Sequence, residues 1–257
     1  MSVLDVHMFP CLSDNYGVLV HDPVSGATAS IDAPDADTVL AAVAETGWGL
    51  SHVVVTHHHW DHIGGIPKLK AETGCRIVGA ASDAHRIEGL DEAVADGDEF
   101  ALGQAPLRAI AVPGHTLGHL AWWCLEGGVA FVGDTLFAMG CGRVFEGTPE
   151  MMWQSLDRLQ QTLPDDTLVY CGHEYTLSNA KFAVTVDPDN PVLKSRLERV
   201  VELRREGHPT LPTTMAQEKA TNPFLRARDA GIRRTLGLEA AKDWEVFAEI
   251  RSRKDHF

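Results

Sequence analysis

One short segment constrains this chain more than any other, because residues 57–62 read His-His-His-Trp-Asp-His. Four imidazoles and one carboxylate within six residues form a concentration of metal ligands that packing alone rarely explains. The segment follows residues 51–56, an apolar run rich in β-branched residues that predicts a strand. A surface histidine cluster resembling a purification tag is the alternative. Such tags are uniform and terminal, whereas this segment is internal and is interrupted by Trp60 and Asp61.

The spacing within this segment predicts one half of a two-metal site. If the chain stays extended past Thr56, the side chains of His57 and His59 point to the same side and can share one ion. Asp61 and His62 follow where the chain turns into a Gly-Gly pair, so they can face a second ion.

The remaining ligands are expected from three later segments, because two divalent ions need about six to eight ligands. In each segment a candidate follows an apolar strand pattern and a glycine, where the backbone can bend and approach closely. These candidates are His115, Asp134 and His173. Two other histidines are expected to support the site without binding metal, His58 from the opposite side of the chain and His119 through a hydrogen bond within its loop.

A histidine and carboxylate site for two adjacent dications, without a cysteine cluster, favours hydrolysis. A water that bridges the ions is acidified towards neutral pH and becomes the nucleophile, while the ions polarise a carbonyl group. Asp61 is expected to orient this nucleophile, and Glu174, beside His173, is a candidate for orienting the ligands.

Composition and cysteine usage predict a cytoplasmic protein without a membrane partner. A chain of 257 residues can form one large domain or two smaller ones. No run approaches the ~18 apolar residues of a membrane span, and the N-terminus has no secretory-signal pattern. The five cysteines are scattered and form no CxxC motif, so they are expected to be reduced, and Cys171 is expected to pack rather than to bind metal.

The distribution of charge separates the chain into an acidic part and a weakly basic part. The net charge of −14 argues against nucleic acid as the main partner. Residues 1–173 contain 7 basic and 23 acidic side chains, a balance of −16, whereas residues 174–257 contain 15 and 13, a balance of +2. An anionic substrate would have to be held by those basic residues that reach the metal site.

The hydrophobic patterns predict an α/β fold in which two sheets pack together and are covered by helices. Strands are expected at residues 3–9, 16–20, 27–31, 53–56, 107–112, 120–125, 129–132 and 167–171. Helices are expected at residues 37–45, 66–73 and 150–163, and then at 175–185, 190–206 and 240–251. The change of pattern predicts a catalytic domain in residues 1–173 and a smaller helical, substrate-binding domain in residues 174–257, docked on the first.

The order of the ligands resembles that of the metallo-β-lactamase superfamily, whose hydrolases carry HxHxDH, then a His, a bridging Asp and a final His. The resemblance implies the αββα sandwich of that superfamily. It assigns to one ion the ligands His57, His59 and His115. It assigns to the other ion the ligands Asp61, His62 and His173. Asp134 would bridge both ions.

Further motifs resemble one family within the superfamily, the glyoxalase II (hydroxyacylglutathione hydrolase) family. They are GDTLF with GCGR at residues 133–143, CGHEYT at 171–176, EKATNPF at 218–224 and the ending RSRKD at 251–255. The match covers nearly the whole chain. It implies hydrolysis of S-D-lactoylglutathione and related 2-hydroxyacylglutathiones to glutathione and D-lactate, the second step of methylglyoxal detoxification.

The same resemblance implies that four side chains bind the glutathione part, namely Arg143, Tyr175, Arg251 and Lys254. Glutathione carries carboxylates, which suit guanidinium and ammonium donors. For Arg251 and Lys254, a frayed and solvated terminus is the alternative. Many family members have lysine at position 143 and tyrosine two residues later, where this chain has Arg143 and Phe145, so one hydroxyl contact with the substrate is expected to be missing.

Two other kinds of protein compete with this interpretation. One is a different enzyme of the superfamily, such as a persulfide dioxygenase with a single iron, a lactamase or a lactonase; the dioxygenase lacks the long basic tail domain. The other is a non-catalytic metal-binding or RNA-processing module, against which the acidic first part and the complete ligand set argue. Two zinc ions per chain are expected, with iron or manganese as alternatives, in a monomer.

Overall fold

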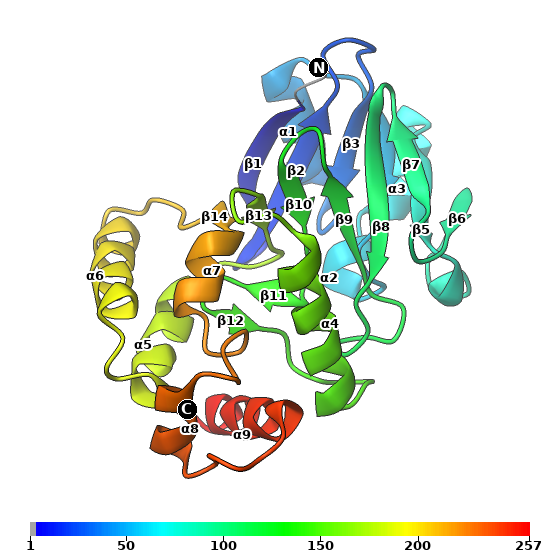
Figure 1. The fold of residues 1–257 in the computed structure, drawn as a ribbon. Coiled ribbons are helices and arrows are strands. Elements are labelled where there is room, and N and C mark those ends of the chain that lie inside the picture. The colour runs from blue at the N-terminus through cyan, green and yellow to red at the C-terminus, as the bar shows by residue number, and fades with distance from the viewer. Residues whose placement is uncertain (1–3) are drawn as a thin grey trace. The chain divides into compact units, whose positions relative to one another are not determined.

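The computed structural model describes residues 4–257, and the chain forms two compact units (Figure 1). The first unit comprises Met1–Val112 and Thr116–Gly133, and the second comprises Pro113–His115 and Asp134–Phe257. The two units do not divide after residue 173, where the domain boundary was predicted. The division into a catalytic and a substrate-binding domain stays a prediction.

In the first unit, one mixed sheet contains six strands in chain order (Figure 1). The strands are β1 (Asp5–Cys11), β2 (Asn15–His21), β3 (Thr28–Ile31), β4 (Leu50–Val54), β5 (Arg76–Ala80) and β6 (Glu92–Val94). The first three strands pair antiparallel, and β3 to β6 pair parallel. The central strands β2 and β3 are almost continuously buried, as expected for strands covered on both faces.

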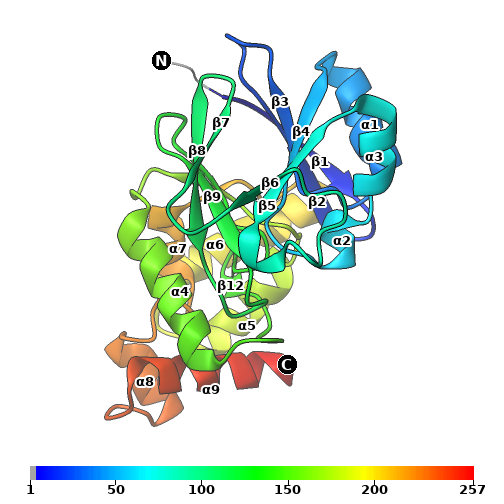
Figure 2. The same cartoon turned by 90° about the vertical axis from the view of Figure 1, so that its right-hand side faces the viewer.

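Two helices of the first unit, α1 (Ala36–Thr46) and α3 (Ile66–Thr73), lie along one face of this sheet (Figure 2). Their ends follow from local sequence. The Asp35 carboxylate caps α1 by accepting a hydrogen bond from the Thr38 N–H at 2.9 Å. Helix α3 has proline in its first turn and ends at Gly74, whose φ of +70° favours glycine.

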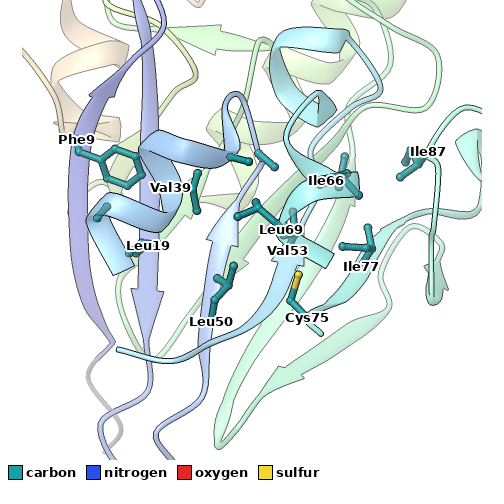
Figure 3. Packing of buried hydrophobic residues seen from close by; sticks show 14 residues of the cluster. Phe9, Leu19, Val39, Leu50, Val53, Ile66, Leu69, Cys75, Ile77 and Ile87 are labelled. Carbon is teal, nitrogen blue, oxygen red and sulfur yellow. The ribbon is translucent and has the colours of Figure 1, made fainter. Parts of the chain in front are cut away.

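The apolar sides of these helices pack on the sheet in one cluster (Figure 3). Val39 from α1 and Leu69 from α3 are fully buried against Leu19, Val53 and Ile77 of the strands. This packing fixes the carboxyl end of β4, from which the His-rich segment emerges.

A second, antiparallel set of strands in the first unit has the order β7-β8-β9-β10, with β7 (Glu99–Leu102), β8 (Ala105–Ala111), β9 (Leu120–Cys124) and β10 (Val129–Phe131). Two hydrogen bonds tie this set to the chain that leaves β4. Trp122 Nε1 donates to the Val55 carbonyl at 3.0 Å, and the Leu120 N–H donates to the Thr56 carbonyl at 2.8 Å. The backbone just before His57 is therefore held by both sets of strands.

The second unit is mainly helical. Its helices are α4 (Pro149–Thr162), α5 (Thr176–Val186), α6 (Pro191–Arg205), α7 (Met215–Thr221), α8 (Ala230–Leu236) and α9 (Asp243–Asp255). Two short antiparallel pairs accompany them, β11 (Leu136–Phe137) with β12 (Gly140–Cys141), and β13 (Leu168–Tyr170) with β14 (Thr213–Thr214). Helices α5 and α6 share a small core around Met139, Ala180 and Leu193. In residues 4–257 no helix combines the length and the hydropathy needed to cross a bilayer.

The predicted elements agree with the structure where the local signals are strong, as in α3, α4 and α6. The start of the first predicted strand, at residue 3, lies outside the described residues. The strand predicted at residues 53–56 was placed too late, because β4 ends at Val54 and the Thr56 N–H donates to the Asp32 carboxylate at 2.6 Å. The last helix was placed too early, since α9 begins at Asp243 and continues to Asp255. Short elements such as β5 to β7, α7 and α8 were missed.

Candidate metal centre

His57 and His59 lie in the loop between β4 and the short helix α2 (Trp60–Ile63). His57 Nε2 and His59 Nδ1 are 3.0 Å apart. The two rings therefore meet as predicted, although through loop geometry and not through alternation along a strand. His57 is buried, and the ring of His119 stacks on it with a centroid distance of 4.6 Å.

Asp61 and His62 are both in helix α2, where their ligand atoms face each other. Asp61 Oδ2 is 3.7 Å from His62 Nε2. The side-chain amide of Asn15 donates to the carboxylate and to the main-chain carbonyl of Asp61, each at 3.2 Å. The turn predicted here is thus a single helical turn, and Asn15 fixes its acidic side chain.

Asp32 is a functional residue that the sequence interpretation missed. It lies directly after β3, is buried and has a φ of +58°, a region that aspartate enters more readily than most residues. Its carboxylate accepts hydrogen bonds from the Thr56 N–H and hydroxyl, and lies 2.8 Å from His62 Nδ1. An Nδ1–H directed at a carboxylate leaves His62 Nε2 with the lone pair that a metal requires. The sequence did offer one signal for Asp32, because it directly follows an apolar strand, as the predicted ligands do.

The His58 ring contacts the edge of the His59 ring, with centroids 5.2 Å apart, and its nitrogens face other partners. Its Nδ1 lies 2.8 Å from an oxygen of Asp83, which is buried. The Arg86 guanidinium lies 3.1 Å from its Nε2. These contacts agree with the supporting role expected for His58.

In the second unit, two predicted histidine ligands converge on the carboxylate of a third predicted ligand, Asp134. Asp134 Oδ2 is 3.6 Å from His115 Nε2 and 3.2 Å from His173 Nε2. All three residues are buried. His115 Nδ1 lies 2.8 Å from the main-chain carbonyl of Arg143, so Nε2 is again the nitrogen left for a ligand.

These distances suit divalent metal ions. A zinc ion with four ligands at about 2.0–2.1 Å separates neighbouring ligand atoms by about 3.3–3.4 Å. The two pairs in the first unit, at 3.0 and 3.7 Å, and the two in the second unit, at 3.6 and 3.2 Å, lie close to this value. The donor set of imidazole and carboxylate groups is one that zinc, iron and manganese all accept.

Two buried cysteines that lie near the predicted ligands in the sequence bond the main chain. Cys141 Sγ donates to the Gly142 carbonyl at 3.4 Å and Cys171 Sγ to the His173 carbonyl at 3.5 Å. Burial raises the pKa of the Cys141 thiol to about 11 and that of the Cys171 thiol to about 12. The structure supports the predicted packing role of Cys171.

The cationic residues predicted to bind substrate gather at the C-terminal helix in the second unit. Arg251 is buried and donates to the Cys141 carbonyl at 2.9 Å. The Asp255 carboxylate lies 2.9 Å from the Arg251 guanidinium and 3.8 Å from that of Arg143. Lys254 donates to the Ser178 hydroxyl at 2.9 Å. The alternative of a frayed terminus is therefore wrong, since helix α9 is held in place up to Asp255.

Two aromatic rings accompany the predicted histidine ligands of the second unit. The Tyr175 ring stacks on His173, with centroids 4.8 Å apart and planes inclined by 4°. The Phe145 ring is 5.1 Å from His115 and its side chain is exposed. Tyr175 therefore presents a phenol beside a ligand, while Phe145 presents only an apolar edge.

Comparisons with known proteins cover the whole of this architecture. Residues 13–173 match the family described as "Metallo-beta-lactamase superfamily", and residues 174–257 match "Hydroxyacylglutathione hydrolase C-terminus". The chain is 55% identical over 255 residues to the hydroxyacylglutathione hydrolase of Methylococcus capsulatus, covering 99% of both chains. It is 53% identical over 257 residues to that of Maricaulis maris, covering 100% of both. The crystal structure of ETHE1 from Myxococcus xanthus is 28% identical, with a TM-score of 0.66 and 98% of both chains covered.

The fold and the ligand set define a metal-dependent hydrolase of the metallo-β-lactamase superfamily, with an αββα sandwich followed by a smaller helical domain. Its histidine and aspartate clusters support the binding of divalent metal. Within that superfamily, the chain belongs to the hydroxyacylglutathione hydrolase (glyoxalase II) family. The fold class and the family predicted from the sequence are thereby confirmed.

Proposed function

We propose that this protein hydrolyses S-D-lactoylglutathione and related 2-hydroxyacylglutathiones to glutathione and D-lactate with two metal ions. The observation that carries the proposal is the set of four ligand-atom pairs, two in each unit, at 3.0–3.7 Å. Two divalent ions are a common device for activating water against a carbonyl group. The names of the relatives at more than 50% identity support the choice of substrate.

We propose the ligand assignment that the family resemblance implies. One ion would be held by His57, His59 and His115, the other by Asp61, His62 and His173, with Asp134 shared. The pairs observed within each unit support this assignment. Each pair in the first unit belongs to one ion, and the same oxygen of Asp134 faces one ligand of each ion.

When bound, the two ions would supply Lewis acidity and a water of lowered pKa for attack on the thioester carbonyl. Asp61 would orient the attacking water by accepting its hydrogen bond, and Asn15 holds the Asp61 carboxylate for that task at 3.2 Å. The leaving thiolate has a pKa near ~8.5, so it can depart without a strong general acid. The chain therefore needs no separate nucleophilic side chain.

The glutathione part is proposed to bind Arg143, Tyr175, Arg251 and Lys254. Three of these groups are cations, and cations suit the carboxylates of glutathione. The Arg143 side chain is 66% exposed, so most of its donors are open to a ligand. We further propose that residues 174–257 form the substrate-binding domain. Arg143, in the proposed catalytic domain, would bind the same substrate.

The finer properties predicted from the sequence are retained as part of the proposal. The two ions are proposed to be zinc, because imidazole-rich sites of this kind suit it. A cytoplasmic location is proposed because all five cysteines are free thiols, as expected in a reducing compartment. We propose that the protein acts as a monomer.

A thioesterase assay on S-D-lactoylglutathione, with elemental analysis of the same sample, tests the proposed function. We expect hydrolysis together with two metal ions per chain, and we expect a chelator to abolish the activity until zinc is restored. One iron per chain with oxygen uptake on a persulfide would favour a dioxygenase. Retention of RNA on a filter, without thioesterase activity, would favour a non-catalytic module.

The role of Lys254 can be tested through pH. Burial, followed by the nearby charge of Arg251, lowers the pKa of Lys254 to about 8. The Lys254 side chain is therefore charged below about pH 8 and loses its charge as the pH rises above that value. The KM of the wild type should consequently increase above about pH 8. Lys254→Arg should keep a low KM at higher pH because a guanidinium stays charged.

Lys254→Ala completes this series as the variant without a cation. We expect a raised KM at every pH and a nearly unchanged kcat, because the contact is made equally with substrate and transition state. The flanking charges of Arg143, Arg251 and Asp255 remain in all three proteins, so only the charge at residue 254 differs. A loss of kcat at constant KM would show that Lys254 is not a simple anchor.

A further inference from the structure

A buried carboxylate and a buried amide lie beneath the short β11–β12 hairpin of the second unit. Glu218 is in helix α7, and Asn222 directly follows that helix, within the EKATNPF motif. Both side chains are fully buried. The proposed chemistry uses neither of them, yet a buried carboxylate is costly unless its partners are well placed.

Both side chains bind the main chain of the hairpin at its turn. The Asn222 amide donates to the Phe137 carbonyl at 3.1 Å and to the Gly140 carbonyl at 2.9 Å. One oxygen of Glu218 accepts hydrogen bonds from the Met139 N–H at 2.8 Å and from Asn222 at 3.0 Å. Together they satisfy three backbone groups of a turn in which Met139 has a φ of +54°.

The second oxygen of Glu218 faces the opposite way and anchors the carboxylate. It accepts hydrogen bonds from the Arg196 guanidinium at 2.5 Å and from the Thr213 hydroxyl at 2.7 Å. Arg196 belongs to α6 and Thr213 to β14, so two further elements fix the position of Glu218. The turn of the hairpin is thereby tied to the helical part of the second unit.

The open end of the same hairpin carries two residues of the proposed site. Asp134 precedes β11 and Arg143 follows β12. The Gly142 N–H donates to the Thr135 carbonyl at 3.3 Å, and a Cβ on Gly142 would lie only 1.9 Å from the Asp134 carbonyl. Each strand has two residues, and such a ribbon is too short to keep its own position.

On the basis of the proposed function, we infer that Glu218 and Asn222 are positioning residues that set the placement of Asp134 and Arg143. They hold the turn of the hairpin, and the two strands transmit that position to the open end, where a proposed metal ligand precedes β11 and a proposed substrate-binding guanidinium follows β12. One structural device thus adjusts metal affinity and substrate affinity together.

The test compares Asn222→Ala with the wild type by zinc titration against a chromophoric chelator, in the full-length protein and at a temperature where both are folded. We expect zinc affinity to fall about 10-fold or more, as for other residues that orient metal ligands, and KM for the thioester to rise with it. Asn190→Ala is the matched control, because the same substitution removes an amide that caps helix α6 and donates to the Ala220 carbonyl at 2.9 Å, while the hairpin contacts stay in place. It should lower the unfolding midpoint without changing zinc affinity.

Equal zinc affinity in Asn222→Ala, Asn190→Ala and the wild type would overturn the inference and leave Asn222 with a purely structural role. If Asn222→Ala does not fold, Asn179→Ala takes its place, since the Asn179 amide donates to the Ala138 carbonyl of the same turn at 3.2 Å. The zinc titration needs no substrate. If the wild type binds zinc but does not hydrolyse the thioester, the proposed function is contradicted. The zinc affinities of the variants would still decide this inference.

Discussion

Asp134→Asn is expected to lower kcat/KM for the thioester by more than about 100-fold and to leave fewer than two metal ions per chain. The substitution keeps the size of the side chain and removes its charge. One oxygen of Asp134 faces ligand nitrogens of both His115 and His173, at 3.6 and 3.2 Å. A neutral amide cannot offset the repulsion between two dications, so occupancy should fall first. Elemental analysis and steady-state kinetics on the same sample measure both effects.

Asp166→Asn provides the matched control for this experiment. Asp166 is an exposed carboxylate in the turn between α4 and β13. The same change of charge there should leave metal content and kinetics at wild-type values. If Asp134→Asn retained two ions and turned over normally, its proposed role as the shared ligand would be refuted.

Asp32→Asn is expected to deplete one of the two ions, because Asp32 orients His62 without binding metal in the proposed site. An asparagine NH₂ placed at His62 Nδ1 would make that nitrogen an acceptor and put the proton on Nε2, where the metal should bind. We expect the affinity for that ion to fall about 10- to 100-fold. The free energy of unfolding should also fall by about 1–3 kcal/mol, since the buried Thr56 hydroxyl loses its acceptor while the remaining oxygen still accepts from the Thr56 N–H.

Asp35→Asn serves as the control for Asp32→Asn. Asp35 is the N-cap of α1, and asparagine caps a helix about as well as aspartate. Metal content and unfolding should therefore match those of the wild type. Titration of each metal-free protein with zinc measures how many ions bind. If Asp32→Asn lost both ions together, a role of Asp32 confined to His62 would be contradicted.

Much of the fold was predictable because its signals are local. The strand patterns come from apolar runs, and the ends of α3 follow from a proline in its first turn and from Gly74. The predicted ligands could be identified for the same reason, since each of their segments follows a strand and three of them, His115, Asp134 and His173, directly follow a glycine. The boundary of β4 was wrong because it depends on Asp32, a residue 24 positions away from Thr56.

The supporting residues could not be predicted in this way. Asp32, Glu218 and Asn222 act through contacts with residues far along the chain, such as the bond from Asn222 to Phe137, 85 positions apart. No spacing rule links such pairs, because the distance between them depends on how whole elements pack. The EKATNPF motif was assigned to a family from the sequence, but the structure shows that its buried acid and amide hold the turn of a hairpin.

The amino-acid sequence by itself determined which donor atoms this protein offers, in which order along the chain, and the family to which that order belongs. The tertiary structure alone decided which nitrogen of His62 and His115 is turned towards a ligand position, and how far apart the donors lie within each unit. The reason is physical. Donor identity is a property of single residues, whereas distances and proton positions arise from burial of apolar faces, which brings distant carboxylates and carbonyls against each ring.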